Sequence, residues 1–260
     1  SKAIRENPAL CLFICLIEAW MREGGDPAWP EFAAPAGEGI GYDMLYIYPA
    51  IPTMAESVAY LRSRNVPEDV IAGTMQEYDR CIADGEYRDG RATMTVRLCS
   101  WMRTVIENRL INIDRLNYDI PGHYFEHVRI FRKESETVVL ASGLTLHRSG
   151  RILGAAGCDD ATGSFVAAIT ETENSVTGHK VVKGIVERET ITLSKADWEQ
   201  VLCDDDLVPR IHIPRQGSFD AESIQASIDR ARQVFATCYP DMPYKAIFCE
   251  SWLLSEDLKD

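Results

Sequence analysis

The stretch that decides the fold is Val208-Pro-Arg-Ile-His-Ile-Pro-Arg-Gln-Gly-Ser-Phe219. It begins with a short apolar strand, predicted over Arg210 to Ile213. Pro214 closes this strand, because proline has no N–H to give to a sheet ladder. The next three residues form a tight polar loop. Asp220 is then predicted as the N-cap of a helix, since its carboxylate can accept an N–H of the first turn.

The helix that follows is predicted to end near Cys238, before two prolines. Its apolar face is formed at helical spacing by Ile224, Ile228, Ala231, Val234 and Phe235. A second strand is predicted over Lys245 to Leu253. Strand, glycine loop, helix and strand make a βαβ-like unit, whose helix N-terminus can bind an anion through free N–H groups. A purely structural alternative stays open, in which Gly217 only permits a turn and Asp220 only caps the helix. The Asp220 carboxylate would also compete with an anion for the same N–H groups.

Composition narrows the class of protein. The chain has 260 residues, 46% of them hydrophobic, and a net charge of −13. This is a soluble globular composition, and the acidity argues against a general nucleic-acid or anionic-membrane binder. The apolar run from Ala9 to Ala19 is too short to span a bilayer and contains Glu18. The eight cysteines are scattered without a Cys-x-x-Cys pair, which favours reduced thiols in a cytoplasmic protein and no metal site.

Residues 1–109 are predicted to form an all-helical domain. The helices expected are Pro8 to Arg22, Met44 to Arg64 (kinked or divided by Pro49 and Pro52), Pro67 to Ala83, and Thr95 to Asn108. The predicted buried face of the first is Leu12, Cys15, Leu16 and Ala19, and that of the third is Ile71, Met75, Tyr78 and Ile82. The segment from Asp26 to Gly41 is expected to be an ordered loop.

Residues 110–260 change from helical to strand periodicity. Strands are expected over Leu110 to Ile120, His127 to Arg132, Thr137 to His147, Ser164 to Thr172 and His179 to Val186, the last two joined through Asn174 to Gly178. Ser194 is expected to cap a short helix that carries Trp198, Val201 and Leu202. Successive strands without long helices predict an antiparallel meander, and the whole chain therefore has an α+β fold.

A second loop has an anion-binding pattern. Arg151-Ile-Leu-Gly-Ala-Ala156 fits the sequence Arg/Gln-x-x-Gly-x-Gly/Ala, which cradles the CoA pyrophosphate in N-acetyltransferases. That role requires a loop between a strand end and a helix. Here the pattern follows a hairpin turn and leads into loop-like sequence, so coincidence is the alternative.

The carboxy-terminal half resembles a known family. Ile-His-Ile-Pro-Arg-Gln-Gly-Ser-Phe-Asp-Ala-Glu-Ser (211–223) and Pro-Tyr-Lys-Ala-Ile-Phe-Cys-Glu-Ser-Trp-Leu-Leu (243–254) are similar to the bacterial acyltransferase-domain family. Residues 66–70 and 109–119 resemble it too. The family pairs a helical N-acyltransferase N-terminal domain with a GNAT-like C-terminal domain, which implies a GNAT-like mixed sheet and acyl transfer from acetyl-CoA or another acyl-CoA to an amine.

The resemblance implies a CoA site. The loop from Pro214 to Ser218 would lie where GNAT enzymes bind pyrophosphate, and the strand from Ile247 to Ser251 would splay from Arg210–Ile213 to admit pantetheine. The cofactor-binding residues expected on this basis are Ile213, Arg215, Gln216, Gly217, Ser218 and Ser251. Two departures from the family pattern stand out. The usual glycine pattern is missing at the strand–helix junction, and the family's last helix and hairpin are not found in the sequence up to Asp260.

The expected chemistry is direct acyl transfer, which needs a base for the amine. His212 and Glu250 are the predicted bases because both lie on the candidate strands. The alternatives are a satisfied structural histidine, a solvated carboxylate, and a ping-pong route through Cys249. The predicted partner is a small-molecule amine, with no nucleic acid or membrane, and a homo-oligomer is compatible with the sequence. A non-catalytic GNAT-like binding or regulatory protein is the alternative function.

Overall fold

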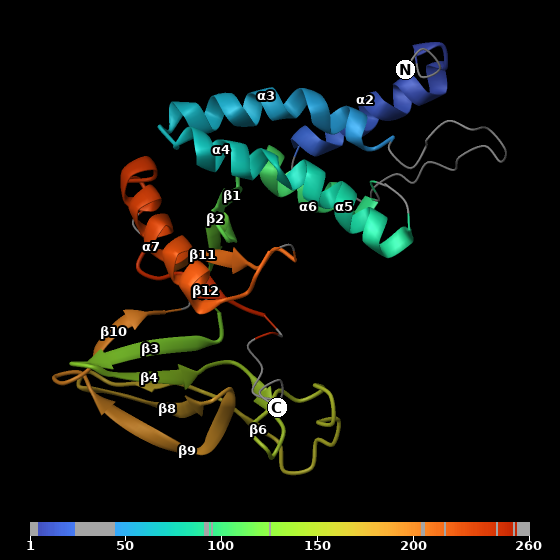
Figure 1. Ribbon diagram of the computed structural model, residues 1–260. Coiled ribbons are helices and arrows are strands. Elements are labelled where there is room, and N and C mark those ends of the chain that lie inside the picture. The colour runs from blue at the N-terminus through green and yellow to red at the C-terminus, as the bar shows by residue number, and fades with distance from the viewer. Residues whose placement is uncertain are drawn as a thin grey trace. The chain divides into compact units, whose positions relative to one another are not determined.

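The computed structural model describes residues 5–23, 45–90, 94, 96–124, 126–203, 206–215, 217–242, 244–251 and 253 (Figure 1). The Asp26 to Gly41 loop, Gln216 and Trp252 lie outside these residues. The chain forms two compact units. Unit 1 comprises residues 1–122 and 210–243, and unit 2 comprises residues 123–209 and 244–260. Unit 1 is therefore discontinuous in sequence.

The helices of the described residues all belong to unit 1. They are α2 (Pro8–Glu23), α3 (Ile47–Ser63), α4 (Glu68–Met75), α5 (Glu77–Asp89), α6 (Val96–Ile106) and α7 (Ala221–Cys238) (Figure 1). The predicted helices are confirmed in place, with two corrections. The helix predicted over Pro67 to Ala83 is two helices, separated at Gln76, and Pro67 is an N-cap rather than a first-turn residue. Helix α3 continues through Pro52, which excludes division, one of the two effects predicted for its prolines.

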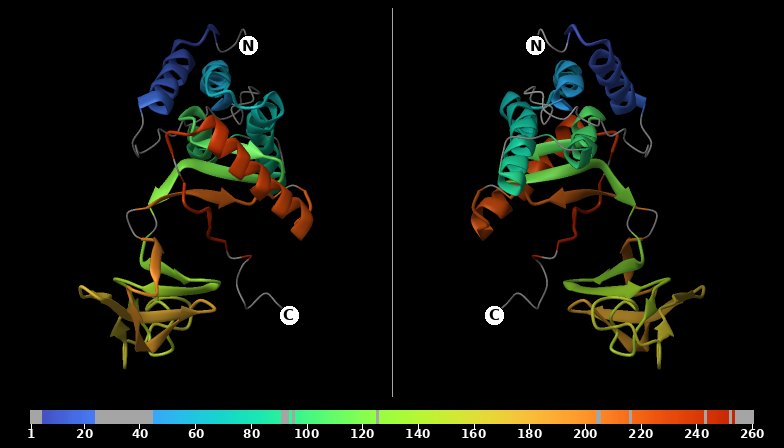
Figure 2. Two further views of the ribbon diagram at one scale, coloured as in Figure 1. Left: turned by 90° about the vertical axis from the view of Figure 1, so that its left-hand side faces the viewer. Right: turned by 90° about the vertical axis from the view of Figure 1, so that its right-hand side faces the viewer.

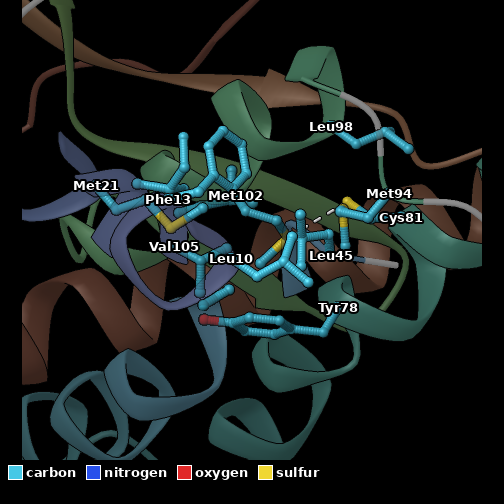
Figure 3. Close-up of a cluster of buried hydrophobic side chains, with 13 residues drawn as sticks. Leu10, Phe13, Met21, Leu45, Tyr78, Cys81, Met94, Leu98, Met102 and Val105 are labelled. Carbon is cyan, nitrogen blue, oxygen red and sulfur yellow. Dashed lines mark hydrogen bonds between the residues drawn. The ribbon is translucent and has the colours of Figure 1, made fainter. Parts of the chain in front are cut away.

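The predicted buried face of α2 is wrong. Leu12 and Leu16 are 63% and 47% exposed, whereas Ile17 and Met21 are fully buried. The helix is apolar around most of its circumference, so helical spacing alone fits either face. The buried side chains join a core with α3, α5 and α6 (Figure 3), whose members are Leu10, Phe13, Ile17, Met21, Leu45, Ala50, Tyr78, Cys81, Met94, Leu98, Met102, Val105 and Leu110.

The strand predicted over Leu110 to Ile120 is a hairpin. Strand β1 (Leu110–Ile113) pairs antiparallel with β2 (Leu116–Tyr124). Asp114, at the turn, has a φ of 52°, in the left-handed region that aspartate tolerates better than most residues. Alternating side chains along the whole segment are compatible with one long strand, and the polar pair Asp114-Arg115 was not recognised as a turn.

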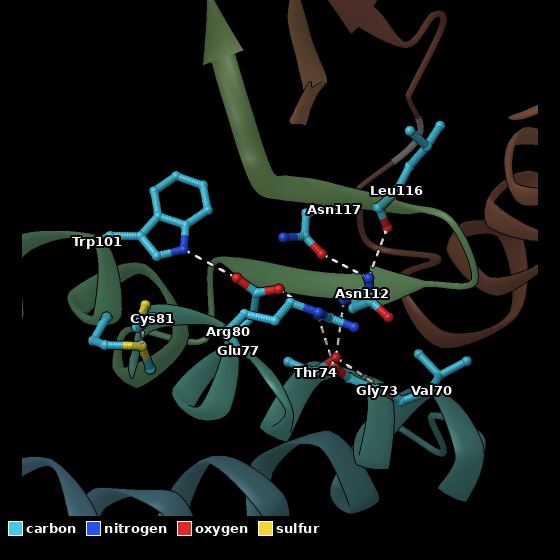
Figure 4. A network of polar contacts seen from close by, with 11 residues as sticks. Val70, Gly73, Thr74, Glu77, Arg80, Cys81, Trp101, Asn112, Leu116 and Asn117 are labelled. Carbon is cyan, nitrogen blue, oxygen red and sulfur yellow. Dashed lines mark hydrogen bonds and ion pairs between the residues drawn. The ribbon is translucent and has the colours of Figure 1, made fainter. Parts of the chain in front are cut away.

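One face of this hairpin packs against α4 (Figure 4). The Thr74 hydroxyl accepts the Asn112 N–H at 2.9 Å, and the Asn112 amide donates to Asn117 Oδ1 at 2.7 Å. All three residues are buried. A Cβ on Gly73 would lie 2.7 Å from Asn112 Oδ1, so a glycine is needed where the helix approaches the strand. Buried polar groups are thus satisfied across the helix–hairpin contact.

The other face of the hairpin packs against α7. Ser227 donates to the Ile113 carbonyl at 2.6 Å, and its hydroxyl lies 3.0 Å from the Tyr118 hydroxyl. The Tyr118 ring meets Phe235 edge-on, with centroids 5.5 Å apart. Burial raises the pKa of Tyr118 to about 12. The predicted helix with an Asp220 N-cap is confirmed, with Ala231, Val234 and Phe235 buried and Ile224 and Ile228 half-buried.

Unit 2 is built mainly from antiparallel strands (Figure 2). They are β3 (Val128–Lys133), β4 (Glu136–Ala141), β5 (Thr145–Leu146), β6 (Phe165–Val166), β7 (Thr170–Glu171), β8 (Ser175–Val182), β9 (Ile185–Ser194), β10 (Glu199–Leu202) and β12 (Phe248–Cys249). One sheet has the order β10-β3-β4-β8-β7, with β9 paired to β8. A further sheet has the order β1-β2-β11-β12, and β2 and β11 (Leu207–His212) each run from one unit into the other.

Five predictions for the strands need correction. The strands predicted over Thr137 to His147 and over Ser164 to Thr172 are each two shorter strands, β4 and β5 in the first segment and β6 and β7 in the second. The strand predicted over His179 to Val186 is instead the β8–β9 hairpin, turning at Lys183 and Gly184, whose φ angles of 50° and 77° suit a tight turn. The residues 174–178, predicted to join two strands, lie mostly within β8. The second βαβ strand, predicted over Lys245 to Leu253, is only the two-residue β12.

The helix predicted after Ser194 is also absent. Ser194 does accept the Ala196 N–H through its hydroxyl, at 3.3 Å. This cap supports one turn, after which β10 pairs with β3. The residues of β10 therefore form hydrogen bonds with β3 at the sheet edge in place of the hydrogen bonds of a helix. Trp198 packs beside the buried Phe131 and Val138.

The mixed helices and antiparallel sheets confirm the predicted α+β fold class. The division predicted between residues 109 and 110 does not coincide with the two compact units, because unit 1 includes the β1–β2 hairpin and α7. As a division between homologous domains it stays a prediction. None of the helices in the described residues is long and apolar enough to cross a membrane.

The two faces of α2 give a test of the core. Replacing Ile17, fully buried, with alanine is expected to lower the free energy of unfolding by about 2–5 kcal/mol, because it leaves a cavity. The matched change Leu16→Ala, on the exposed face, should stay within about 0.5 kcal/mol of the parent. Urea unfolding followed by circular dichroism measures both. The reverse ranking would restore the face predicted from the sequence.

Candidate active site

His212 is the last residue of β11 and lies in unit 1. Its side chain is 27% exposed. The ring packs edge-on against Trp101 of α6, with centroids 4.9 Å apart and planes at 82°. The histidine predicted as a base is thus held against an aromatic wall and keeps part of its surface accessible.

Asp119 of β2 is the carboxylate beside this histidine. Its side chain is only 5% exposed, and Oδ2 lies 4.0 Å from His212 Nε2. Arg109 donates to both carboxylate oxygens, at 3.2 and 3.3 Å. The distance of 4.0 Å is longer than a hydrogen bond. Nε2 is buried and has no hydrogen-bond partner within the described part of the chain. A buried carboxylate therefore faces a buried ring nitrogen.

Trp101 is itself fixed by a polar contact (Figure 4). Its indole N–H donates to Glu77 Oε2 at 3.1 Å, and Glu77 is buried and paired with Arg80. Arg80 also donates to the Gly73 carbonyl at 3.3 Å. Gly73, the residue of α4 that approaches the hairpin, is thus connected through Arg80 and Glu77 to Trp101, which packs against His212.

Arg215, the predicted phosphate ligand, is bound to α5. Its guanidinium lies 3.0 Å from the centroid of the Tyr87 ring, and Nη1 is 3.7 Å from Asp84 Oδ1. Cation–π and ion-pair contacts of this kind hold an exposed arginine in place. The loop after β11 is therefore anchored on a helix by the residue expected to bind CoA.

The next part of the loop approaches the β1–β2 turn. Gly217 has a φ of 93°, which favours glycine, and the Ser218 carbonyl accepts a hydrogen bond from Arg115 Nε. Burial lowers the pKa of Arg115, while the nearby Asp220 acts in the opposite direction. Arg115 Nη1 is buried and has no hydrogen-bond partner among the residues described. This cation beside the loop was missed in the sequence.

Asp220 caps α7 with three hydrogen bonds. Its carboxylate accepts the Ser223 N–H at 2.8 Å, the Ser218 hydroxyl at 2.7 Å and the Ser223 hydroxyl at 2.8 Å. These bonds to the charged form lower its pKa to about 2, the Ser223 N–H contributing most. The carboxylate thus occupies part of the position where the sequence predicted an anion.

The remaining predicted residues are placed as follows. Ile213 and Pro214 are half-buried and follow β11, while Glu250 is exposed, follows β12 and belongs to unit 2. Ser251 is half-buried in the same unit and accepts the Leu253 N–H at 3.3 Å. Because His212 and Glu250 belong to different units, their roles as the two candidate bases of one site stay a prediction, as does the splay of the two strands. Cys249, the alternative nucleophile, is half-buried.

The Arg151 to Ala156 pattern lacks the context that CoA binding requires. These residues form turns and an isolated bridge between Ile152 and Leu146, and the described residues directly after them, up to β6, form no helix. The pattern is therefore a coincidence. No group of three or more potential metal ligands occurs within the part of the chain that is described.

Two further residues of this site were missed in the sequence. Asp119 stands between Tyr118 and Ile120, all three buried, so both faces of β2 are covered. An acidic residue inside a strand that is buried on both faces is unusual, and this pattern could have identified Asp119 as a candidate functional residue. Trp101 lies within the helix predicted over Thr95 to Asn108, and nothing in its local sequence indicates the histidine beside it.

Comparison with protein families defines the class of the chain. Residues 110–260 of the 260 match the family model described as the GNAT-like C-terminal domain. The chain therefore belongs to the GNAT-like C-terminal domain family. The match includes β1 to β12 and α7, hence Asp119 and His212. Comparison with curated proteins gives no match.

Solved structures of acyltransferases share the fold. An acyltransferase in complex with CoA and 10C-teicoplanin aligns with a TM-score of 0.58 at 15% identity, over 98% of this chain and 55% of that chain. An acyltransferase in complex with decanoyl-CoA and teicoplanin gives 0.58 at 14% identity, over 98% and 55%. An acyltransferase in complex with decanoyl-CoA gives 0.52 at 15%, over 95% and 53%. The chain spans about half the length of these structures.

The Asp220 cap predicts a specific acid dependence. The pKa is depressed from 3.8 to about 2 in the folded protein, so the cap's charged form stabilises the fold above about pH 4. This contribution is lost as the pH falls from about 4 to about 2. The urea midpoint of Asp220→Asn should therefore lie below that of the parent at neutral pH and approach it in acid. Asp229→Asn, on the exposed side of α7, is the control and should show no such convergence.

Proposed function

We propose that this protein is an acyltransferase that moves an acyl group from acyl-CoA to an amine. The observation that carries the proposal is the geometry of His212, which lies between Trp101 and a buried carboxylate and directly precedes the loop into α7. Membership of the GNAT-like family supports it. So do the fold relatives, which are acyltransferases in complex with CoA or decanoyl-CoA.

The proposed reaction is direct transfer. His212 takes a proton from the attacking amine, whose nitrogen forms a bond to the thioester carbonyl carbon. The C–S bond then breaks and the CoA thiolate leaves, to be protonated in turn. An isolated amine is protonated at neutral pH, so a base with accessible surface near the attacking nitrogen is the group that the reaction most needs. Glu250 stays the second predicted base.

The proposed CoA site includes Ile213, Arg215, Gln216, Gly217, Ser218 and Ser251. Arg215 and Arg115 would supply positive charge on two sides of the Gly217–Ser218 segment. Guanidinium groups bind phosphate oxygens in a bidentate manner. For Arg215 to bind phosphate it must give up or share its contacts with Asp84 and Tyr87.

A second function is favoured by a specific observation. The N-terminus of α7 is already capped by Asp220, and Arg215 is already paired. A GNAT-like protein with these positions filled would bind a regulatory ligand or partner instead of CoA. The amine acceptor, a cytoplasmic location and homo-oligomer formation also stay predictions. Teicoplanin, present in two relatives, indicates the kind of small-molecule acceptor to screen first.

CoA binding separates the two functions. Acetyl-CoA or decanoyl-CoA at about 100 times its dissociation constant should stabilise the native state by about 2.7 kcal/mol in a thermal-shift titration. Arg215→Ala should weaken this stabilisation. Arg232→Ala removes the same charge from an exposed position on α7 and should leave it unchanged. Absence of stabilisation at millimolar CoA would favour the binding protein.

Transfer activity tests His212. His212→Asn should lower kcat by about 10²- to 10⁴-fold, the usual contribution of a general base, with acyl-CoA binding retained. The assay measures free thiol released from acyl-CoA with an amine panel. His179→Asn, in β8 of unit 2, is the matched control and should keep parental activity. Equal activity of His212→Asn and the parent would exclude the proposed base.

A further inference from the structure

The Asp119 carboxylate has a defined orientation toward His212. Arg109 donates to both of its oxygens, at 3.2 and 3.3 Å, and Arg109 is itself paired with Glu107 at 3.2 Å. The carboxylate is thereby held in one plane, with Oδ2 4.0 Å from His212 Nε2. A carboxylate can only accept hydrogen bonds. The ring nitrogen that faces it is therefore favoured as the protonated one.

The imidazole is also restrained from turning over. A 180° rotation about the Cβ–Cγ bond would move Nε2 away from Asp119 and place Nδ1 on the other side of the ring. Trp101 packs edge-on against the ring, and its own indole is fixed by Glu77. Edge-to-face contacts of aromatic rings have a preferred geometry, so the wall favours one ring orientation. The buried Nε2 and the 27% exposure of the side chain place its accessible surface away from Nε2.

We propose that Asp119, oriented by Arg109, is a positioning residue that holds His212 as the Nε2–H tautomer and leaves Nδ1 as the proton acceptor. This inference rests on the proposed acyltransferase function only for its catalytic consequence. The tautomer itself is a property of the folded protein. Asp119 touches neither substrate nor reacting atoms.

The catalytic step then has a definite proton path. The amine N–H proton passes to Nδ1 while nitrogen bonds to the carbonyl carbon, and the ring becomes an imidazolium whose Nε2–H faces the Asp119 carboxylate. When the C–S bond breaks, the thiolate takes up a proton and the ring returns to neutral. A carboxylate that holds the base in one tautomer and stabilises its charged form serves the same purpose in other histidine-dependent enzymes.

Nitrogen NMR of the histidine ring tests the tautomer directly. The chain has five histidines, and His212→Gln assigns the signal by its loss from ¹⁵N-histidine-labelled protein. At a pH where the rings are neutral, the parent should show a protonated Nε2 and an unprotonated Nδ1. Asp119→Ala should shift His212 toward the other tautomer. Asp119→Asn should do so too, because its amide oxygen would accept from Arg109 and its NH2 group would then face Nε2 as a donor.

A second carboxylate of the same hairpin provides the control. Asp114→Ala removes a carboxylate from the turn of the same hairpin, where it pairs with Arg230, and should leave the His212 signals unchanged. Proton spectra establish that each variant is folded. A parental Nδ1–H tautomer, or an unchanged His212 in folded Asp119→Ala, would overturn the proposal.

Kinetics separates this proposal from the proposed function. If the parent transfers acyl groups, folded Asp119→Ala should lose roughly tenfold in kcat, less than removal of the base itself, with KM for acyl-CoA unchanged. Asp119→Asn should not recover that loss, because its NH2 group cannot accept the Nε2–H while Arg109 donates to its oxygen. If the parent is inactive but shows the Nε2–H tautomer, the function fails and the positioning role stands. If it is active with the Nδ1–H tautomer, the reverse holds.

Discussion

The structure of unit 1 depends on one constraint, the burial of the β1–β2 hairpin on both faces. Its two strands pair with each other, but buried backbone groups of β1 also form hydrogen bonds with helices on two sides. Thr74 accepts the Asn112 N–H on one side, and Ser227 bonds to the Ile113 carbonyl on the other. Each partner is a small hydroxyl residue on a helix, and leaving a buried donor or acceptor unsatisfied costs about 1–3 kcal/mol. The helices are placed by these polar contacts as well as by the apolar core.

The site follows from the same constraint. Asp119 and Asn117 are two residues apart on β2, so both point to the same face of the hairpin. Trp101 of α6, whose indole N–H bonds to Glu77 of α5, packs against the same histidine that the Asp119 carboxylate faces. A carboxylate is tolerated in this buried position because Arg109 neutralises it. The Asp119 carboxylate, the Trp101 ring and His212 are thus brought together by the alternation of side chains along β2 and by one helix contact. No separate loop is needed to position them.

Much of the fold could be predicted from local sequence. Helix α7 was predicted with its cap because Asp220 and the apolar spacing after it agree, and α6 because its apolar residues occupy one face. The failures have physical causes. Helix α2 is apolar on two sides, so only tertiary packing selects Ile17 over Leu16. Ser194 does form a cap, but β3 competes successfully for the residues after it.

The site could be predicted only in part. His212 was found because it stands at a strand end before a glycine loop. Asp119 and Trp101 were not, since each is more than 90 positions away in the chain and their proximity to His212 is a tertiary property. Arg215 was found as a cation in the loop, yet its contacts with Asp84 and Tyr87 depend on how α5 is placed, which no local pattern encodes.

The discontinuity of unit 1 has a consequence for biosynthesis. Ser227, which covers the second face of the hairpin, follows Ile113 by 114 residues, with most of unit 2 between them. At translation rates of about 5–20 residues per second, the finished hairpin must wait roughly 6 to 20 seconds for its partner. During this time the nascent chain exposes an apolar strand face to solvent. Unit 2 can assemble its own antiparallel hairpins during this interval. Unit 1, whose synthesis begins first, is therefore completed only after most of unit 2 has been made. Chaperone binding would be most useful in that interval.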